Sequence, residues 1–491
     1  MKILMISINK SRAFRPVFPV GMATVAAQTR MHGHTVACLD LCFEAEDERT
    51  VQESIASVRP NIIGISIRNL DSQNFLEPTF YLPLALQVVR WCRATCPNTP
   101  VLLGGAGFSQ SPTEIMAYTQ ADYGIAGPGE ESMPMLLHRL ENRLPTNDVP
   151  GLLYWQAGGS IRAISPDFSI DLSQTASPSR LDYDPRYFDL GTHVGGEQAR
   201  CVESVQTKKG CALDCIFCGN FNIEGRTVNL RPVTEVVDEI EAICARDDGF
   251  EYADGVFNLP LSHALEICRE MRRRNLHAPW SCQLNPSGVT RELVELLVQT
   301  GCQHVEFGTD SGSDSVLRRL KKNFTRAQVI RAHQLVASRG IEIIHCVFIG
   351  APGETRQSVY ETLELMEQLV PDDALQGYQV YWSLGLRILE NSELHRISVA
   401  EGLLHRQDTL GVPRFYLAPQ IAQDRQLLDE IEKRVCAHAN WYLWWGLPNI
   451  PLHERIEQVR LREQKVAQLY DTALVQPVRE AGSRPQEHTY G

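Results

Sequence analysis

The chain contains the stretch Lys208-Lys209-Gly210-Cys211-Ala212-Leu213-Asp214-Cys215-Ile216-Phe217-Cys218-Gly219-Asn220, in which three cysteines have the spacing C-x3-C-x2-C. Three thiolates at this spacing suit a cubane iron–sulfur cluster, because each thiolate binds a different iron. A zinc site would require a fourth Cys or His nearby, and within the next forty residues only Cys244 qualifies, inside an expected helix. Three ligands leave one iron of the cubane open.

After this stretch, apolar segments typical of strands alternate with amphipathic helical segments. Strands are expected near residues 252–257, 280–284, 304–308, 341–349 and 378–388. Helices are expected near residues 233–245, 262–274, 291–299, 313–320, 326–339 and 356–369. With a strand at residues 201–207, the pattern gives six βα units. We predict a partial (β/α)6 TIM-type barrel, whose site lies at the carboxyl ends of the strands.

The first 140 residues or so show the same alternation. Strands are expected near residues 3–8, 35–39, 62–67, 101–103 and 123–126, with helices near 22–31, 51–58, 82–94, 112–119 and 131–140. Short apolar strands between helices predict a doubly wound, Rossmann-like α/β domain with a parallel sheet.

Three turns at the ends of these strands are candidates for a binding site. They are Ser66-Ile67-Arg68-Asn69, Gly104-Gly105-Ala106-Gly107 and Gly127-Pro128-Gly129-Glu130-Glu131. Each turn alone would be explained as a tight βα connection. Together they lie where open α/β sheets bind ligands, and glycine allows close approach of the backbone. A dinucleotide is the weaker candidate, since no G-x-G-x-x-G follows the first strand.

Composition limits the class of protein. The chain has 491 residues, a net charge of −12 and 14 cysteines. Without a basic stripe, a nucleic-acid partner is not expected. No apolar run is long enough to span a bilayer or form a signal peptide, so a cytoplasmic protein with reduced thiols is expected and no membrane partner.

We divide the chain into an N-terminal domain at residues 1–145, a linker with a hairpin at 146–196, the barrel at 197–405 and a small helical C-terminal region at 406–491. Trp441, Tyr442, Trp444 and Trp445 gather in this last region. Packing against the barrel is the favoured role for them, ahead of a lid or a membrane contact. The tail from Pro477 is polar and expected to be disordered.

The cysteine motif, with Phe217 before its last cysteine, is the signature of the radical SAM superfamily, and this part of the chain resembles that family. The resemblance implies a [4Fe–4S] cluster on Cys211, Cys215 and Cys218, with S-adenosylmethionine (SAM) on the open iron. Residues 306–313 resemble the fourth-strand turn of these enzymes, which implies that Asp310 or Ser311 binds SAM. Asp254 and Asn258 occupy the place of the motif that meets the SAM amino group, and residues 348–355 resemble the turn that lines the adenine pocket.

The N-terminal domain resembles the cobalamin-binding domain that precedes many radical SAM barrels. The resemblance implies cobalamin contacts from the three turns: Ser66, Arg68, Gly104, Gly105, Gly127, Gly129 and Glu130. The Asp-x-His-x-x-Gly motif that supplies a histidine to cobalt in other cobalamin folds is absent. Arg68 is therefore the candidate to lie beneath cobalt, where a guanidinium has no lone pair to donate. Pairing of Arg68 with Asp71, or with a propionamide of the corrinoid, is an equal alternative.

Taken together, the resemblance implies a cobalamin-dependent radical SAM methyltransferase. It would transfer a methyl group from SAM, via methylcobalamin, to a carbon or other inert centre of a small-molecule or peptide substrate. In one variant SAM supplies a radical, and in another the substrate attacks methylcobalamin directly. A non-methylating rearrangement, ring contraction or cyclisation is one alternative, and a non-catalytic iron–sulfur or corrinoid sensor is another. A flavodoxin or ferredoxin is the expected electron donor.

Overall fold

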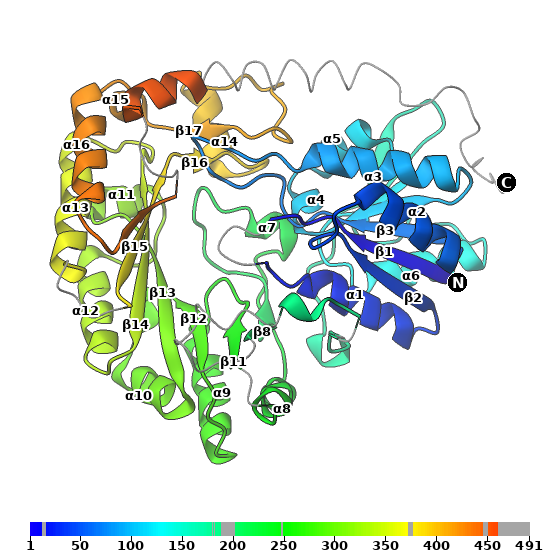
Figure 1. The fold of residues 1–491 in the computed structure, drawn as a ribbon, viewed down its shortest axis with the longest axis horizontal. Coiled ribbons are helices and arrows are strands. Elements are labelled where there is room, and N and C mark those ends of the chain that lie inside the picture. Colours follow the sequence, from blue (N-terminus) through cyan, green and yellow to red (C-terminus); the bar gives the residue numbers. More distant parts are fainter. Residues whose placement is uncertain are drawn as a thin grey trace.

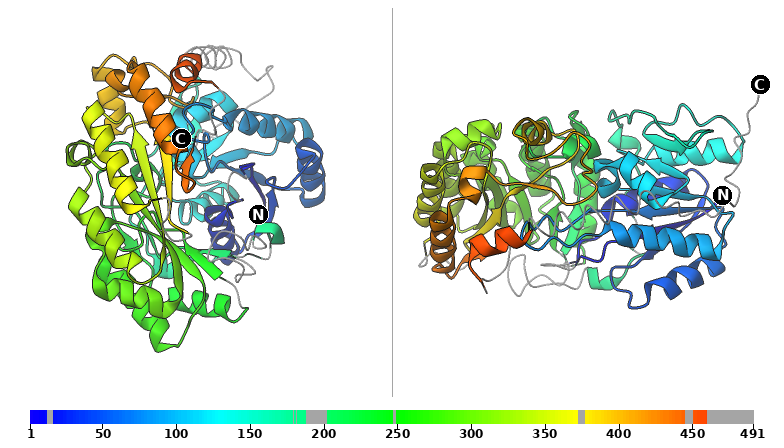
Figure 2. Two further views of the ribbon diagram at one scale, coloured as in Figure 1. Left: turned by 60° about the vertical axis from the view of Figure 1, so that its left-hand side comes forward. Right: turned by 90° about the horizontal axis from the view of Figure 1, so that it is seen from above.

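The computed structural model describes residues 1–11, 16–178, 180, 182–187, 202–246, 249–371, 377–444 and 450–459. Two halves lie side by side, each built on a seven-stranded sheet (Figures 1 and 2). The strand orders are β2-β1-β3-β4-β5-β6-β7 and β18-β15-β14-β13-β12-β11-β8. The features expected at Cys201, Trp445 and the tail from Pro477 lie outside the described residues.

The N-terminal sheet is built from short apolar strands that are buried on both faces. Its strands are β1 (Lys2–Ser7), β2 (Thr35–Asp40), β3 (Ile62–Ser66), β4 (Val101–Gly104), β5 (Tyr123–Ile125), β6 (Leu152–Trp155) and β7 (Ile161–Ala163). The first five strands are parallel, whereas β6 and β7 continue the sheet antiparallel. The hairpin expected in the linker thus extends the edge of this sheet.

Helices cover both faces of the N-terminal sheet. They are α1 (Val20–Met31), α2 (Asp47–Val58), α3 (Leu82–Thr95), α4 (Ala106–Gln110), α5 (Pro112–Thr119) and α6 (Ser132–Glu141). Val51, Leu82 and Met116 of α2, α3 and α5 belong to one core cluster, whereas Met22 and Leu136 of α1 and α6 belong to another. The two clusters lie on opposite faces of the sheet, so the predicted doubly wound arrangement is confirmed.

The second sheet is curved, and its strands are all parallel. They are β8 (Val202–Val205), β11 (Gly249–Tyr252), β12 (Trp280–Leu284), β13 (Cys302–Asp310), β14 (Glu342–Ile349), β15 (Gln379–Leu384) and β18 (Trp441–Leu443). Along β13, Val305 and Phe307 are buried in the core, whereas His304 and Glu306, which alternate with them, line the barrel cavity. This alternation follows from the two-residue period of a strand.

Most helices of this half cover the outside of the barrel, whereas the short α7 lies between the two halves (Figure 1). The helices of this half are α7 (Asn220–Ile223), α8 (Val233–Cys244), α9 (Leu261–Arg273), α10 (Arg291–Thr300), α11 (Asp314–Arg319), α12 (Arg326–Ala337), α13 (Arg356–Leu369), α14 (Glu393–Ala400), α15 (Pro419–Ala422) and α16 (Arg425–Cys436). Thr325 and Thr355 begin α12 and α13 with capping boxes. Two small antiparallel pairs complete the fold: β9 (Lys208–Lys209) with β10 (Asn229–Leu230), and β16 (Leu386–Arg387) with β17 (Phe415–Tyr416). The predicted TIM-type barrel is confirmed.

Two elements differ from the sequence prediction. The strand expected at residues 252–257 lies at Gly249–Tyr252 instead, so only Tyr252 was placed correctly. Beyond it the Asp254 carboxylate accepts hydrogen bonds from Thr207 N at 2.9 Å and from the Thr207 hydroxyl, which fixes a turn. In addition, β18 pairs with β15 and adds a seventh strand to the six that were expected. The C-terminal aromatic segment is therefore part of the barrel sheet as well as packed against it.

The loop after β3 joins the two halves. Its residues Phe75 and Leu76 belong to the barrel core, and Phe75 meets Phe415 edge to face at 5.5 Å. Beside them, Arg387 Nε donates to Asp71 Oδ2 at 2.7 Å, with both side chains at most 4% exposed. Such a pair favours one orientation of the halves, since a shift of one half would leave each charge buried without its partner. No helix in the described part of the chain is long and apolar enough to cross a membrane.

We expect the substitution Asp71→Ala to lower the free energy of unfolding by about 3–5 kcal/mol, because Arg387 would stay buried without its carboxylate. Urea denaturation followed by circular dichroism measures the change. The double variant Asp71→Ala/Arg387→Met should recover much of the loss. Glu53→Ala, which removes an exposed ion pair with Arg49, is the control and should cost less than about 1 kcal/mol. A loss for Asp71→Ala as small as that of the control would contradict this role.

Candidate active site

The three motif cysteines lie in a loop that starts directly after β9. Cys211 N donates to Gly225 O at 3.2 Å, and Ile216 is fixed by backbone hydrogen bonds to Leu320 and Leu394. Gly210, just before the loop, has a φ of +88°, and a Cβ there would lie 1.8 Å from Thr227 O. Only glycine fits this approach. The loop is therefore held on both sides by the barrel.

The three thiols are close enough to affect one another's ionisation. Burial raises the pKa of Cys215 to about 11; Lys322 lowers it, and Asp310, Cys218 and Cys211 raise it. All three cysteines are free thiols. Among the described residues, no three His, Cys, Asp or Glu side chains converge on one point as a single metal ion requires. A cubane does not need that convergence, since its thiolates bind separate irons. The loop thus fits the cluster, whose irons would displace the thiol protons.

An ion pair between Asp310 and Lys322 lies beside this loop. Asp310 ends β13 with a φ of +60°, and its Oδ2 lies 2.6 Å from Lys322 Nζ. Burial lowers the pKa of Lys322, but Asp310, and after it Cys215, raise it above its ordinary value. Lys322 therefore stays charged and also lies 5.8 Å from the Phe217 ring centroid. Asp310, a predicted SAM contact, is held toward this lysine.

Lys322 was not predicted as a site residue. Its stretch, Lys321-Lys322-Asn323-Phe324-Thr325, resembles a segment that follows the fourth strand in the family, and that resemblance was the available signal. Sequence alone did not say which lysine is buried. In the structure Lys322 faces Asp310, whereas Lys321 lies at the surface between Asp214 and Glu393.

Two other predicted SAM contacts turn toward protein groups. Asn258 Nδ2 donates to Asn285 O at 2.9 Å, and Asn285 N donates to Asn258 Oδ1 at 2.8 Å. Both ends of the Asn258 side-chain amide are therefore hydrogen-bonded to the backbone of Asn285, just after β12. Ser311 Oγ lies 3.2 Å from Thr362 Oγ1 and is fully buried. Neither residue lines a described cavity. Asp254 lines one, but its carboxylate is already bonded to Thr207 and Lys208.

The barrel encloses a cavity of about 1040 Å³. Cys218 and Phe217 lie at one end of it, where Phe217 meets Phe348 edge to face at 5.3 Å. The inward side chains of six strands form the wall: Glu251, Ser281, Gln283, His304, Glu306, Ile344, Cys346, Tyr381, Ser383 and Tyr442. The cavity therefore begins beside the cluster loop and continues into the barrel, which leaves space for SAM and a second molecule.

A second cavity of about 550 Å³ lies at the carboxyl edge of the N-terminal sheet. All seven residues expected to contact cobalamin line it: Ser66, Arg68, Gly104, Gly105, Gly127, Gly129 and Glu130. Gly105 is required by the fold itself, because its φ is +100° and a Cβ would lie 2.6 Å from Ile67 O. The three turns that are far apart in sequence thus form one pocket.

Two polar groups of this pocket fit a corrinoid. Glu130 is ion-paired with Lys209 across the two halves, but its Oε2 is buried without a hydrogen-bond partner in the described chain, as an amide-bearing ligand would require. Arg68 meets no described carboxylate, since Asp71 pairs with Arg387 instead. Burial lowers the pKa of Arg68, with the Tyr187 and Tyr81 hydroxyls opposing that change. Arg68–Asp71 pairing is therefore wrong, and no histidine is among the described residues that line the pocket.

The two cavities meet. Ile223, Glu251, Tyr252 and Gln283 line both of them, so the N-terminal pocket opens toward the barrel cavity at the ends of β11 and β12. A group bound at the N-terminal sheet edge would face a molecule inside the barrel. Such a junction allows a group to pass between two bound molecules without crossing solvent.

We expect Cys211→Ala, Cys215→Ala and Cys218→Ala each to retain less than about a tenth of the wild-type iron after anaerobic reconstitution, because each removes one of three cluster ligands. Iron analysis and visible absorbance measure the loss. Cys436→Ala replaces an exposed cysteine on α16 and should keep the full iron content. Iron retained by a motif variant at the level of Cys436→Ala would remove that cysteine from the ligand set.

Comparison with known proteins agrees with both cavities. The Radical SAM superfamily model matches residues 205–366, and the B12 binding domain model matches residues 8–137. The chain is 27% identical over 443 residues to tryptophan 2-C-methyltransferase of Streptomyces laurentii, covering 78% of this chain and 72% of that protein. It is 24% identical over 373 residues to the anaerobic magnesium-protoporphyrin IX monomethyl ester cyclase of Rubrivivax gelatinosus, covering 74% and 64%.

The fold also matches solved structures. The radical SAM methyltransferase TsrM from Kitasatospora setae, solved with cobalamin and a [4Fe-4S] cluster, superposes with a TM-score of 0.77 at 21% identity, over 95% of this chain and 99% of that one. OxsB, a cobalamin-dependent SAM radical enzyme, gives 0.70 at 15% identity, over 96% and 72%. A B12-binding domain joined to a radical SAM barrel, in this order and with these cavities, places the chain in the family of cobalamin-dependent radical SAM enzymes.

Proposed function

We propose that this cobalamin-dependent radical SAM methyltransferase transfers the methyl group of SAM to a carbon atom of a small molecule held in the barrel cavity. When bound, the corrinoid supplies a carrier for the methyl group, and the cluster with SAM supplies the methyl source and one-electron chemistry. The protein has to bind these groups in line, exclude water and leave room for the substrate. A relative that methylates a carbon of tryptophan supports the proposal.

One observation carries this proposal: the N-terminal pocket and the barrel cavity share four wall residues, of which Glu251, Tyr252 and Gln283 come from β11 and β12. Tyr252 is fully buried against Phe257, with ring centroids 4.2 Å apart, so this part of the wall is fixed. A methyl group carried at the sheet edge would therefore meet the substrate across a rigid junction. Proximity of this kind lowers the entropic part of the barrier.

Arg68 is the residue that we propose to face the lower side of the corrinoid. It lines the N-terminal pocket, has no carboxylate partner in the described chain and cannot donate a lone pair. A cationic, non-ligating side chain at this point would leave the corrinoid without a strong lower ligand. The corrinoid, when bound, would then supply methyl-carrier chemistry while Arg68 holds its position without binding the metal.

The thiols and the cavity also support narrower statements about partners. All thirteen cysteines of the described residues are free, as expected for a reducing cytoplasmic compartment. In such a compartment a flavodoxin or ferredoxin is the proposed electron donor for the cluster. A cavity of this size inside the barrel favours a small molecule or a peptide as substrate over a folded macromolecule.

A second candidate is cyclisation without methyl transfer. The similarity to a protoporphyrin ester cyclase supports it, since that relative spans 74% of this chain. In that case the barrel cavity would hold a substrate that loses hydrogen rather than gains carbon. The mass of the product separates the two reactions.

We expect anaerobic incubation of the holoenzyme with reductant, a panel of small aromatic molecules that includes tryptophan, and SAM to give a product heavier by about 14 mass units, one CH2. SAM with a trideuterated methyl group should raise the gain to about 17 units, because the methyl passes intact. Mass spectrometry measures both. A product lighter by two hydrogens would instead support cyclisation, and label in no product would count against methyl transfer to these substrates.

Substitution of Arg68 tests the corrinoid pocket. We expect Arg68→His to shift the visible absorbance of bound hydroxocobalamin and to slow methyl transfer at least tenfold, because imidazole offers a lone pair where the guanidinium has none. Arg68→Lys keeps a cation without a free lone pair and should be affected less. Identical spectra for wild type and Arg68→His would mean that residue 68 does not face the metal.

A further inference from the structure

Glu306 presents one carboxylate oxygen toward the barrel cavity. Its Oε1 accepts hydrogen bonds from Gln283 Nε2 at 3.2 Å and from Cys346 Sγ at 3.5 Å. Within the described residues, no donor reaches Oε2, although the side chain lines the cavity. Two donors on one oxygen fix the carboxylate plane and leave the other oxygen for a ligand.

The charge of the cavity wall limits what that ligand can be. Glu251, Glu306 and Glu342 all line the cavity, and Arg387 is the only Lys or Arg among its described lining residues. The guanidinium of Arg387 is already bonded to Asp71 and to the carbonyl oxygens of residues 388, 410 and 414. No lysine or arginine among the described wall residues is therefore left for an anionic group. A neutral or cationic ligand with hydrogen-bond donors fits the cavity.

An aromatic surface lies next to Glu306. Cys346 is in register with Tyr381, and Tyr381 with Tyr442 of β18. The two tyrosine rings are stacked, with centroids 5.2 Å apart and an interplanar angle of 22°. Cys346, the neighbour of Tyr381 across the sheet, donates to Glu306 Oε1, so this ring lies near the Glu306 carboxylate. Burial raises the pKa of Tyr381 to about 12. A flat ring could stack here with its edge toward Glu306.

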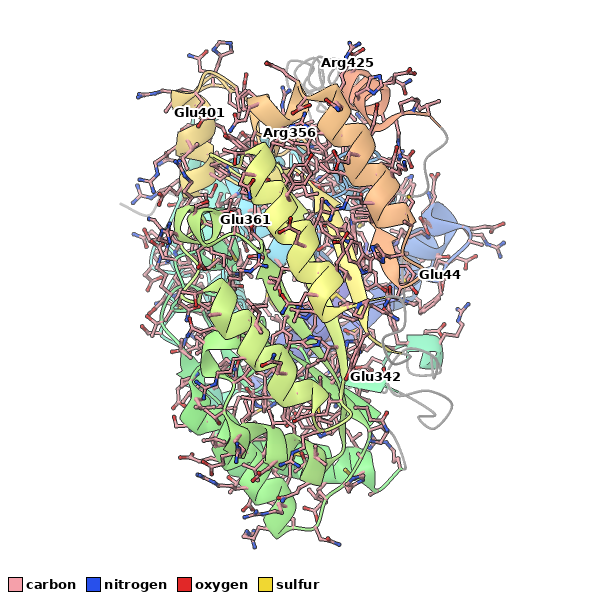
Figure 3. All side chains as sticks on the ribbon, turned by 90° about the vertical axis from the view of Figure 1, so that its left-hand side faces the viewer. Glu44, Glu342, Arg356, Glu361, Glu401 and Arg425 are labelled. Carbon is pink, nitrogen blue, oxygen red and sulfur yellow. The ribbon has the colours of Figure 1, made fainter. Side chains whose placement is uncertain are left out.

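The depth of Glu306 separates it from the cluster end of the cavity. Glu306 is in register with Ile344, and Phe348, which meets Phe217 beside the cysteine loop, lies four residues further along β14. Four residues of strand correspond to about 13 Å. Glu342 lies two residues before Ile344, at the start of β14. Arg356 begins α13 after the other end of that strand, and Figure 3 shows the two residues far apart. Glu306 thus lies midway, beyond the cluster loop and above the floor of the barrel.

Resting on the methyl transfer proposed above, we propose that Glu306 determines substrate specificity: it accepts a hydrogen bond from a ring N–H or aromatic amine of a flat, neutral or cationic substrate that lies against Tyr381 and Tyr442. Gln283 and Cys346 hold the carboxylate in place for this contact. The substrate class is thus a nitrogen-bearing aromatic compound. An oxygen or sulfur heterocycle has no N–H and would leave the Glu306 carboxylate without a hydrogen-bond donor, so it would bind more weakly.

Binding of two ring probes to the holoenzyme tests the proposal without turnover. Indole and benzothiophene have nearly the same shape, but only indole carries an N–H. We expect wild-type protein to bind indole about tenfold or more tightly than benzothiophene, because a buried carboxylate left without its donor is costly. Isothermal titration calorimetry measures both affinities. Equal affinities, or no saturable binding of indole, would overturn the proposal.

Substitutions of Glu306 sharpen the test. Glu306→Leu should reduce the indole preference to about one, and Glu306→Gln, which conserves shape if the first variant is unstable, should reduce it at least threefold. Glu295→Leu on the outer face of α10 is the matched control and should keep the wild-type ratio. A preference that survives in both Glu306 variants refutes the assignment. So does a loss of SAM affinity as large as the loss for indole, because Glu306 would then serve SAM.

Failure of this inference can be told from failure of the proposed function. Methylation of the bound corrinoid by SAM, followed by absorbance in the wild-type protein, tests methyl transfer and needs no substrate. If that step occurs and indole is not preferred, only the assignment of Glu306 fails. If indole is preferred and the corrinoid is never methylated, the cavity binds nitrogen-bearing rings but the proposed reaction is wrong.

Discussion

The arrangement of the two cavities depends on a geometric constraint: the carboxyl edges of the two parallel sheets have to face each other at a fixed distance. Both edges are where parallel sheets bind ligands, so their opposition turns two ordinary binding positions into one site. The buried Asp71–Arg387 pair and the insertion of Phe75 into the barrel core maintain that opposition. The Glu130–Lys209 pair adds a link from the N-terminal pocket to the strand that starts the cysteine loop.

Much of the fold of the two halves could be predicted from hydrophobic periodicity, since the long helices and most apolar strands occur close to where the residue pattern placed them. Prediction failed where long-range contacts decide the structure. Beyond β11, a turn is fixed by the hydrogen bond that Asp254 accepts from Thr207, 47 residues away in sequence. Strand β18 could not be assigned to the barrel from sequence. It has only three residues, Trp441–Leu443, and its pairing with β15 depends on the tertiary structure.

The same limit applies to the site. The residues of the N-terminal pocket could be named from three turns, because turns at strand ends converge by topology alone. Lys322 and Glu306 could not, since their importance depends on burial and on neighbours from other strands. Asn258 and Ser311 matched family positions, yet in this chain their side chains are bonded to Asn285 and Thr362. Resemblance locates a turn, whereas the direction of each side chain depends on local hydrogen bonding.

Strand β18 lies at the edge of its sheet, where β15 is its neighbouring strand, and it contributes Tyr442 to the cavity wall. The residues that hold the cofactors are all in earlier parts of the chain. Part of the cavity wall is thus supplied by a unit that follows all the expected cofactor-binding residues in the sequence. Evolution, or a protein engineer, could exchange that unit by recombination and present new substrates to the same chemistry.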